Sequence, residues 1–204
     1  MSRDQSRSEE WANGISHLIG VIIGILSVVY FQMNDYGIGS LIFGGSIILL
    51  YSISSIYHFL SIGDLKHKFR ILDHSAIFIL IAGTYTPFLI EILGGTWEVV
   101  LLSFVWLFAI CGVLFKVFGG VDKRKISIFL YILMGWIFLM VAKPLWAGLY
   151  PHSIFWLLGG GVFYTVGILF YVWERLKFNH LVWHIFVLAG SICHLIGVYR
   201  FENY

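Results

Sequence analysis

The sequence has few charged residues and few cysteines, and each shortage excludes a class of protein. Only 12% of its 204 residues are charged, whereas 59% are hydrophobic and the mean hydropathy is +0.89. This composition is typical of a membrane protein and excludes an ordinary soluble domain. The two cysteines, Cys111 and Cys193, lie in apolar runs, so we expect small buried side chains and no disulfide framework. The net charge of +2 gives no reason to expect a nucleic acid partner.

Long polar segments and internal repeats are also absent. The chain contains seven apolar runs of the length that a membrane-spanning helix needs, at residues 15–33, 38–60, 71–91, 99–118, 126–144, 153–173 and 180–199. The connections are short, which leaves no room for a soluble domain, and the lack of a repeat gives no support to an inverted-repeat transporter. No A-x-A-like cleavage site follows the first run, so we interpret that run as a retained helix. The predicted fold is all-α, a single integral membrane domain of seven transmembrane helices over 1–204.

Basic residues are distributed unequally between the two sides of this predicted bundle. If the N-terminus is cytoplasmic, eleven lysines and arginines fall at the cytoplasmic side and only Lys143 and Arg200 fall at the other. Such a bias is the pattern of the positive-inside rule. We therefore expect the N-terminus in the cytoplasm and the C-terminus outside.

Polar side chains within the apolar runs converge on one level. His58 ends the second run, Asp73 opens the third, and His180 and His184 open the seventh. With the predicted topology all four lie near the cytoplasmic face. Ionisable groups inside a membrane span are costly, so their convergence indicates a functional site.

The spacing of the histidines favours a metal as their common partner. His180 and His184 are four residues apart, so they share one face of a helix and lie about 6 Å apart along its axis. Two imidazoles at this spacing can bind one ion, and His58 would complete a set of three. Three imidazoles around Zn²⁺ leave a fourth position for water. Asp73 would then accept a proton from that water, and Ser54, one turn before His58, would assist as a donor.

Each of these residue types also has a structural explanation. Asp73 could be the N-cap of the third helix, and Ser54 could be a small packing residue. Asn13 and His17, which open the first run, could be interfacial or capping groups. His194 lies ten residues beyond the last predicted ligand, about 15 Å further along the helix, so we expect it to form an interhelical hydrogen bond. Divalent metals other than zinc also accept imidazole.

Three separated motifs resemble those of the bacterial hemolysin III family. These are "SSIYH" at the end of the second run, "LDHS" at the start of the third and "HLVWH" at the start of the seventh, together with "EEWANGISHLIG" near the N-terminus. The superfamily also holds adiponectin and progestin receptors and, more distantly, alkaline ceramidases. The resemblance implies zinc ligands at His58, His180 and His184, an acid at Asp73 and a serine at Ser54.

The resemblance leaves several functions open. It implies a multi-pass protein of the bacterial plasma membrane that acts on membrane lipids, either as a zinc-dependent hydrolase of a lipid amide or ester bond or in lipid homeostasis. The alternatives are a cytolysin, as the family name suggests, and a receptor or sensor with a structural zinc ion. Adipokine-type ligand binding is not expected, because few residues precede the first run. The N-terminal motif falls on Glu10, Asn13 and His17, whose roles stay open, as do protein partners and oligomeric state.

Overall fold

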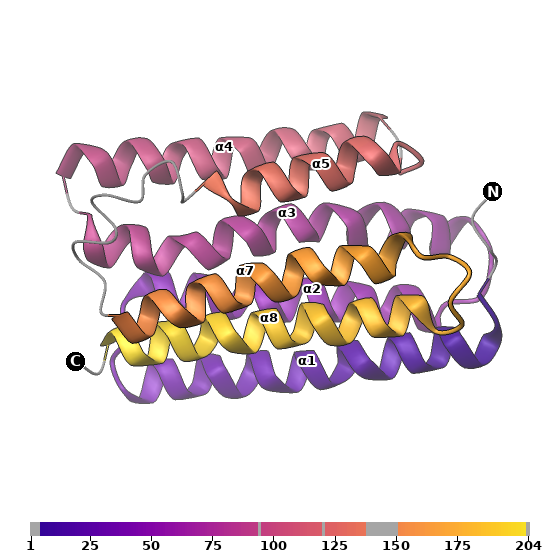
Figure 1. The fold of residues 1–204 in the computed structure, drawn as a ribbon, viewed down its shortest axis with the longest axis horizontal. Coiled ribbons are helices and arrows are strands. Elements are labelled where there is room, and N and C mark those ends of the chain that lie inside the picture. Colours follow the sequence, from indigo (N-terminus) through magenta and orange to yellow (C-terminus); the bar gives the residue numbers. More distant parts are fainter. Residues whose placement is uncertain (1–4, 94, 120, 138–150, 203–204) are drawn as a thin grey trace.

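The computed structural model describes the chain except residues 1–4, 94, 120, 138–150 and 203–204. The regular elements in the described part are all helices: α1 (Arg7–Met33), α2 (Ile38–Phe59), α3 (Asp64–Ile92), α4 (Gly95–Gly119), α5 (Arg124–Gly135), α7 (Pro151–Val172) and α8 (Asn179–Glu202). They lie side by side along one long axis (Figure 1). Helices adjacent in the chain pack against one another, and α8 returns to pack against α1. The predicted all-α class is confirmed.

The helices have the length and surface of membrane spans. Within the described residues, six helices are long and apolar enough to cross a membrane, namely all except α5. Large apolar side chains such as Leu26, Leu107 and Leu169 are exposed on the outside of the bundle, where lipid would cover them. The fifth expected span, 126–144, is untested, because α5 ends at Gly135 and 138–144 lies outside the described residues. The chain is a polytopic membrane protein.

Two helices begin about two turns earlier than the apolar runs predicted. The first begins at Arg7, because Ser6 and Glu9 form a capping box in which each side chain bonds the other's backbone N–H. The third begins at Asp64, so Asp73 lies in its third turn. The alternative interpretation of Asp73 as an N-cap is therefore wrong. Hydropathy marks the apolar part of a helix, whereas hydrogen bonding continues through the polar turns outside it.

The prediction that both cysteines are buried is wrong for one of them. Cys193 is buried, as expected, but Cys111 is exposed. It lies on α4, an outer helix of the bundle in which several other apolar side chains also face outward (Figure 1). In a membrane protein an apolar run does not imply burial within the protein, because lipid is an equally apolar neighbour.

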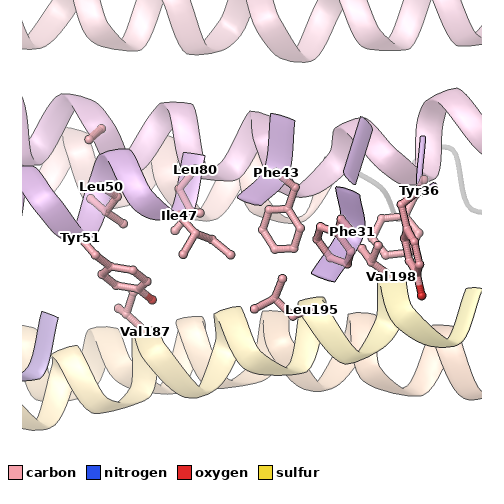
Figure 2. Close-up of a cluster of buried hydrophobic side chains, with 12 residues drawn as sticks. Phe31, Tyr36, Phe43, Ile47, Leu50, Tyr51, Leu80, Val187, Leu195 and Val198 are labelled. Carbon is pink, nitrogen blue, oxygen red and sulfur yellow. The ribbon is translucent and has the colours of Figure 1, made fainter. Parts of the chain in front are cut away.

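Glycines allow the first two helices to pack closely. A Cβ atom at Gly20 would lie 2.5 Å from the ring of Tyr51, so α1 and α2 meet at a distance that only a glycine permits. Beside this contact, Figure 2 shows the main apolar core, in which Ile47 of α2 lies near Val187 and Leu195 of α8. This core joins α1, α2, α3 and α8, the four helices that also carry the candidate site.

One end of the bundle gathers the functional residues. The start of α1, the α2–α3 connection, the α4–α5 connection and the α7–α8 connection lie together at the right of Figure 1, and we call this the N-terminal end. His58 is in the last turn of α2, and His180 is in the first turn of α8. Both therefore lie at the N-terminal end.

Candidate metal centre

Three histidines from two helices converge at the N-terminal end. The ring centroids of His58 and His180 are 5.1 Å apart, those of His58 and His184 are 5.1 Å apart, and those of His180 and His184 are 4.5 Å apart. One ring nitrogen from each lies within 4.8 Å of the others. His184 is completely buried and His58 is 3% exposed. The convergence predicted from the sequence is confirmed.

Hydrogen bonds determine which nitrogen two of these rings offer. Nδ1 of His58 is 2.8 Å from Oε2 of Glu10, and a carboxylate only accepts, so Nδ1 carries the proton. Nδ1 of His184 is 3.1 Å from the Ser16 hydroxyl and 3.3 Å from the carbonyl oxygen of Asn13. The Ser16 hydroxyl donates to that same carbonyl, so it accepts from His184. In both rings Nε2 is left with its lone pair.

The Nε2 atoms of all three histidines are buried and have no hydrogen-bond partner among the described residues. A buried nitrogen without a partner costs about 1–3 kcal/mol, so three at one point need an explanation. A tetrahedral zinc ion requires nitrogens about 3.4 Å apart at its usual bond lengths. The ring nitrogens of the three histidines lie within 4.8 Å of one another, which is close to this separation. The residues fit a metal ion.

Glu10 links the candidate centre to the surface. The same oxygen that accepts from His58 lies 3.1 Å from Nζ of Lys66 in the first turn of α3. Lys66 in turn donates to the carbonyl oxygen of Leu60, at the end of α2. A carboxylate on the far nitrogen of a metal-binding histidine holds the ring in place and raises its basicity. Glu10 is therefore a positioning residue, which the sequence prediction left without a role.

The preceding residue, Glu9, positions the other two ligands. Its Oε1 accepts a hydrogen bond of 2.8 Å from the backbone N–H of Phe178, just before α8 begins. Phe178 has a positive φ of 58°, which is uncommon for a bulky residue. The contact holds the turn from which His180 and His184 emerge. Adjacent carboxylates of α1 thus contact both ligand-bearing elements.

His17 adds a fourth imidazole. The sequence predicted only that His17 lies near the same membrane face as the other three histidines. Its ring stacks on that of His184, with centroids 3.5 Å apart and planes inclined by 12°. The opposite side meets the edge of Tyr51 at 4.8 Å. Neither of its nitrogens has a partner within the described residues. His17 and Glu10 are seven residues apart, which is two helical turns. This spacing could have placed both residues on one face of α1.

Asp73 and Ser54 lie beside the histidines. Asp73 is 4% exposed, and its carboxyl group interacts electrostatically with His58. The Ser54 hydroxyl is its neighbour, at a geometry that falls short of a hydrogen bond. Asp73 is not part of the group of mutually close ring nitrogens, so it lies outside the set of candidate metal ligands.

An apolar cavity begins at the candidate centre. Asp73 and His17 line one part of it, and most of the remaining walls are apolar or aromatic side chains of α3, α5, α7 and α8. Its volume is about 120 Å³. A mostly apolar cavity with a few convergent polar groups is the usual form of a small-molecule site.

Sequence comparisons agree with this architecture. The chain is 43% identical over 190 residues to Hemolysin-3 of Bacillus cereus, covering 90% of this chain and 87% of that protein. It is 42% identical to the Hemolysin-3 homolog of Bacillus subtilis (strain 168), covering 90% and 89%. The monocyte to macrophage differentiation factor of Homo sapiens is 24% identical, with 95% of this chain and 84% of that protein covered. The Haemolysin-III related family matches residues 5–195, all seven described helices except the end of α8, and the chain belongs to that family.

Proposed function

We propose that the protein is a zinc-dependent hydrolase that cleaves an amide or ester bond of a membrane lipid. One observation carries the proposal: three unpartnered Nε2 atoms converge beside a buried carboxyl group at one end of an apolar cavity. The histidines supply metal ligands, Asp73 supplies an acid and base, and the cavity supplies room for a hydrocarbon chain.

The ligand set favours zinc. His58, His180 and His184 would hold the ion, and imidazole suits zinc better than it suits magnesium or calcium, which take oxygen ligands. Three protein ligands leave one position open, which is typical of catalytic zinc and not of structural zinc. When bound, zinc would activate a water molecule and polarise the carbonyl group of the substrate.

The remaining residues would handle the proton and the developing charge. In the hydrolysis, the water oxygen bonds to the acyl carbon and the bond to the amine or alcohol breaks. Asp73 takes a proton from the water and returns it to the leaving group. Ser54, whose hydroxyl has no partner among the described residues, donates to the carbonyl oxygen as that oxygen gains negative charge.

The proposed location is the cytoplasmic leaflet of the bacterial plasma membrane. The N-terminal end carries Lys66, Arg70, Arg124 and other basic residues, whereas the two expected at the opposite end, Lys143 and Arg200, have no described side chains. The bias supports a cytoplasmic N-terminus. A lipid of that leaflet would then reach the metal centre with its head group and the cavity with its chain.

The test combines metal analysis with lipid turnover. We expect about one zinc ion per purified chain, loss of that ion in His184→Ala, and release of free fatty acid from at least one amide or ester in a lipid panel. Asp73→Asn should retain the metal and lose turnover. His67→Ala changes an exposed histidine of α3 and serves as the matched control. Turnover that persists in both site variants would refute the hydrolase.

Two alternatives each have one supporting observation. The name of the Bacillus cereus relative, Hemolysin-3, favours a cytolysin. In that case the protein would release dye from liposomes equally well with and without His184. A receptor or sensor is favoured because the ligands come from α2 and α8, which a structural ion would join. It would show metal-dependent thermal stability with no turnover of any lipid in the panel.

A further inference from the structure

The cavity has a second polar region far from the metal centre. His194 and Thr84 line it, while Asp73 and His17 line the part beside the metal ligands. His194 is ten residues beyond His184 on α8, which places it about 15 Å further along the helix axis. A buried imidazole at this depth in a membrane span is costly and calls for a partner.

The bonding of His194 determines which partner it can take. Its Nε2 lies 3.1 Å from the carbonyl oxygen of Leu157 on α7, and this contact is the interhelical hydrogen bond predicted from the sequence. A carbonyl only accepts, so Nε2 carries the proton and Nδ1 of the neutral ring is an acceptor. Nδ1 is buried and has no partner among the described residues. It therefore needs a donor, either O–H or N–H.

The neighbouring helix is shaped to keep this ring in place. A Cβ atom at Gly160 would lie 2.1 Å from Nε2 of His194, whereas a Cβ atom at the adjacent Gly159 would have no neighbour within 4 Å. The ring also meets the edge of Tyr164 at 5.3 Å. The hydroxyl of Tyr164 is engaged with Ser191, so the structure shows no bond between it and Nδ1.

We propose that Nδ1 of His194 accepts a hydrogen bond from a hydroxyl group on the hydrocarbon chain of the bound lipid. The inference rests on the proposed function only in that the cavity takes a lipid with its head group at the metal centre. The hydroxyl would lie about 15 Å from that head group, the rise of ten helical residues. A keto group or second carboxylate at this place would meet an acceptor with an acceptor and is disfavoured.

Oleic acid and ricinoleic acid test the proposal. They differ by one hydroxyl group, which lies about two thirds of the way along the chain of ricinoleic acid. Each unlabelled acid is used to displace radiolabelled oleic acid from the purified protein. We expect ricinoleic acid to bind roughly tenfold more tightly, the factor that one hydrogen bond of about 1.4 kcal/mol supplies. Simple partitioning would favour the less polar oleic acid, so it cannot mimic this result.

Three variants assign the preference to His194. His194→Gln keeps an amide N–H for the Leu157 carbonyl but removes the acceptor at the Nδ1 position, so it should bind both acids equally and oleic acid as before. Gly160→Ala should also remove the preference by displacing the ring, whereas Gly159→Ala should keep it.

The outcomes separate this inference from the proposed hydrolase. Equal displacement by the two acids in the unmodified protein would overturn the hydroxyl site, and so would a preference that survives in His194→Gln. If neither acid displaced the label, both the hydroxyl site and the lipid cavity would be overturned. Lipid turnover together with equal affinities would leave the hydrolase standing and refute the hydroxyl site alone.

Discussion

Replacing Glu10 by glutamine tests whether the carboxylate on His58 contributes to metal binding. The substitution keeps the shape of the side chain and an oxygen that can accept from Nδ1 of His58. It removes the negative charge that makes this hydrogen bond strong and leaves Lys66 without its ion-pair partner. A neutral hydrogen bond is roughly half as strong as a charge-assisted one.

The expected magnitude follows from the position of Glu10. Loss of a carboxylate behind a metal-binding histidine typically weakens metal affinity by about 10 to 100 times, or roughly 1.4–2.8 kcal/mol. The side chain of Glu10 is 22% exposed, while that of His58 is 1% exposed. Because water already screens part of the carboxylate charge, we expect the lower end, about a tenfold rise in the dissociation constant.

The assay is competition for zinc between the purified protein and a chelator of known affinity. Glu98→Gln, the same change in the first turn of α4, is the matched control and should leave the affinity unchanged. Lys66→Gln should change it by less than about threefold, because the carboxylate stays and exposed pairs contribute little. The thermal stability of the metal-free proteins is measured in parallel. An unchanged zinc affinity in Glu10→Gln, or a loss of stability with unchanged affinity, would refute the positioning role.

Three further predictions address packing, metal and topology. Gly20→Ala should lower stability by about 1–3 kcal/mol, because its Cβ would lie 2.5 Å from the Tyr51 ring. Gly45→Ala, whose Cβ would have no neighbour within 4 Å, should leave stability unchanged, and thermal unfolding in detergent compares the two variants. Zinc at 100 times its dissociation constant should stabilise the protein by about 2.7 kcal/mol. A chelator should reverse this effect in the unmodified protein but have no effect in His184→Ala. Alkaline phosphatase fused to the C-terminus should be active, since it folds only outside the cytoplasm; an inactive but full-length fusion would contradict the proposed orientation.

The convergence of polar residues at one end of the bundle could be predicted because such residues are scarce in this sequence. In a span where nearly every residue is apolar, His58 and Asp73 are visible against their surroundings, and the alternating direction of successive helices places them at one end. The helix pitch then determines that His180 and His184 share a face. These arguments need only the positions of the apolar runs and tolerate errors of several residues at their ends.

The positioning residues could not be predicted in the same way. Glu10 lies outside the first apolar run, in a polar turn that hydropathy assigned to the N-terminal segment. Its contact with His58 depends on how closely α1 and α2 approach, which glycines such as Gly20 determine. The stacking of His17 on His184 likewise depends on α8 returning beside α1. Such contacts depend on packing distances that the pattern of a single sequence does not contain.

The histidines at the two ends of the cavity differ in the ring nitrogen that each one commits to the protein. His58 and His184 commit Nδ1 to oxygens of α1, which leaves Nε2, the ring nitrogen farther from the backbone, for an ion. His194 commits Nε2 to a carbonyl of α7 and leaves Nδ1 as an acceptor. Each uncommitted nitrogen costs about 1–3 kcal/mol when buried, against a net stability of roughly 5–15 kcal/mol for a typical domain. A metal ion bound by His58, His180 and His184 would leave Nδ1 of His194 unsatisfied, because that atom lies toward the other end of the cavity.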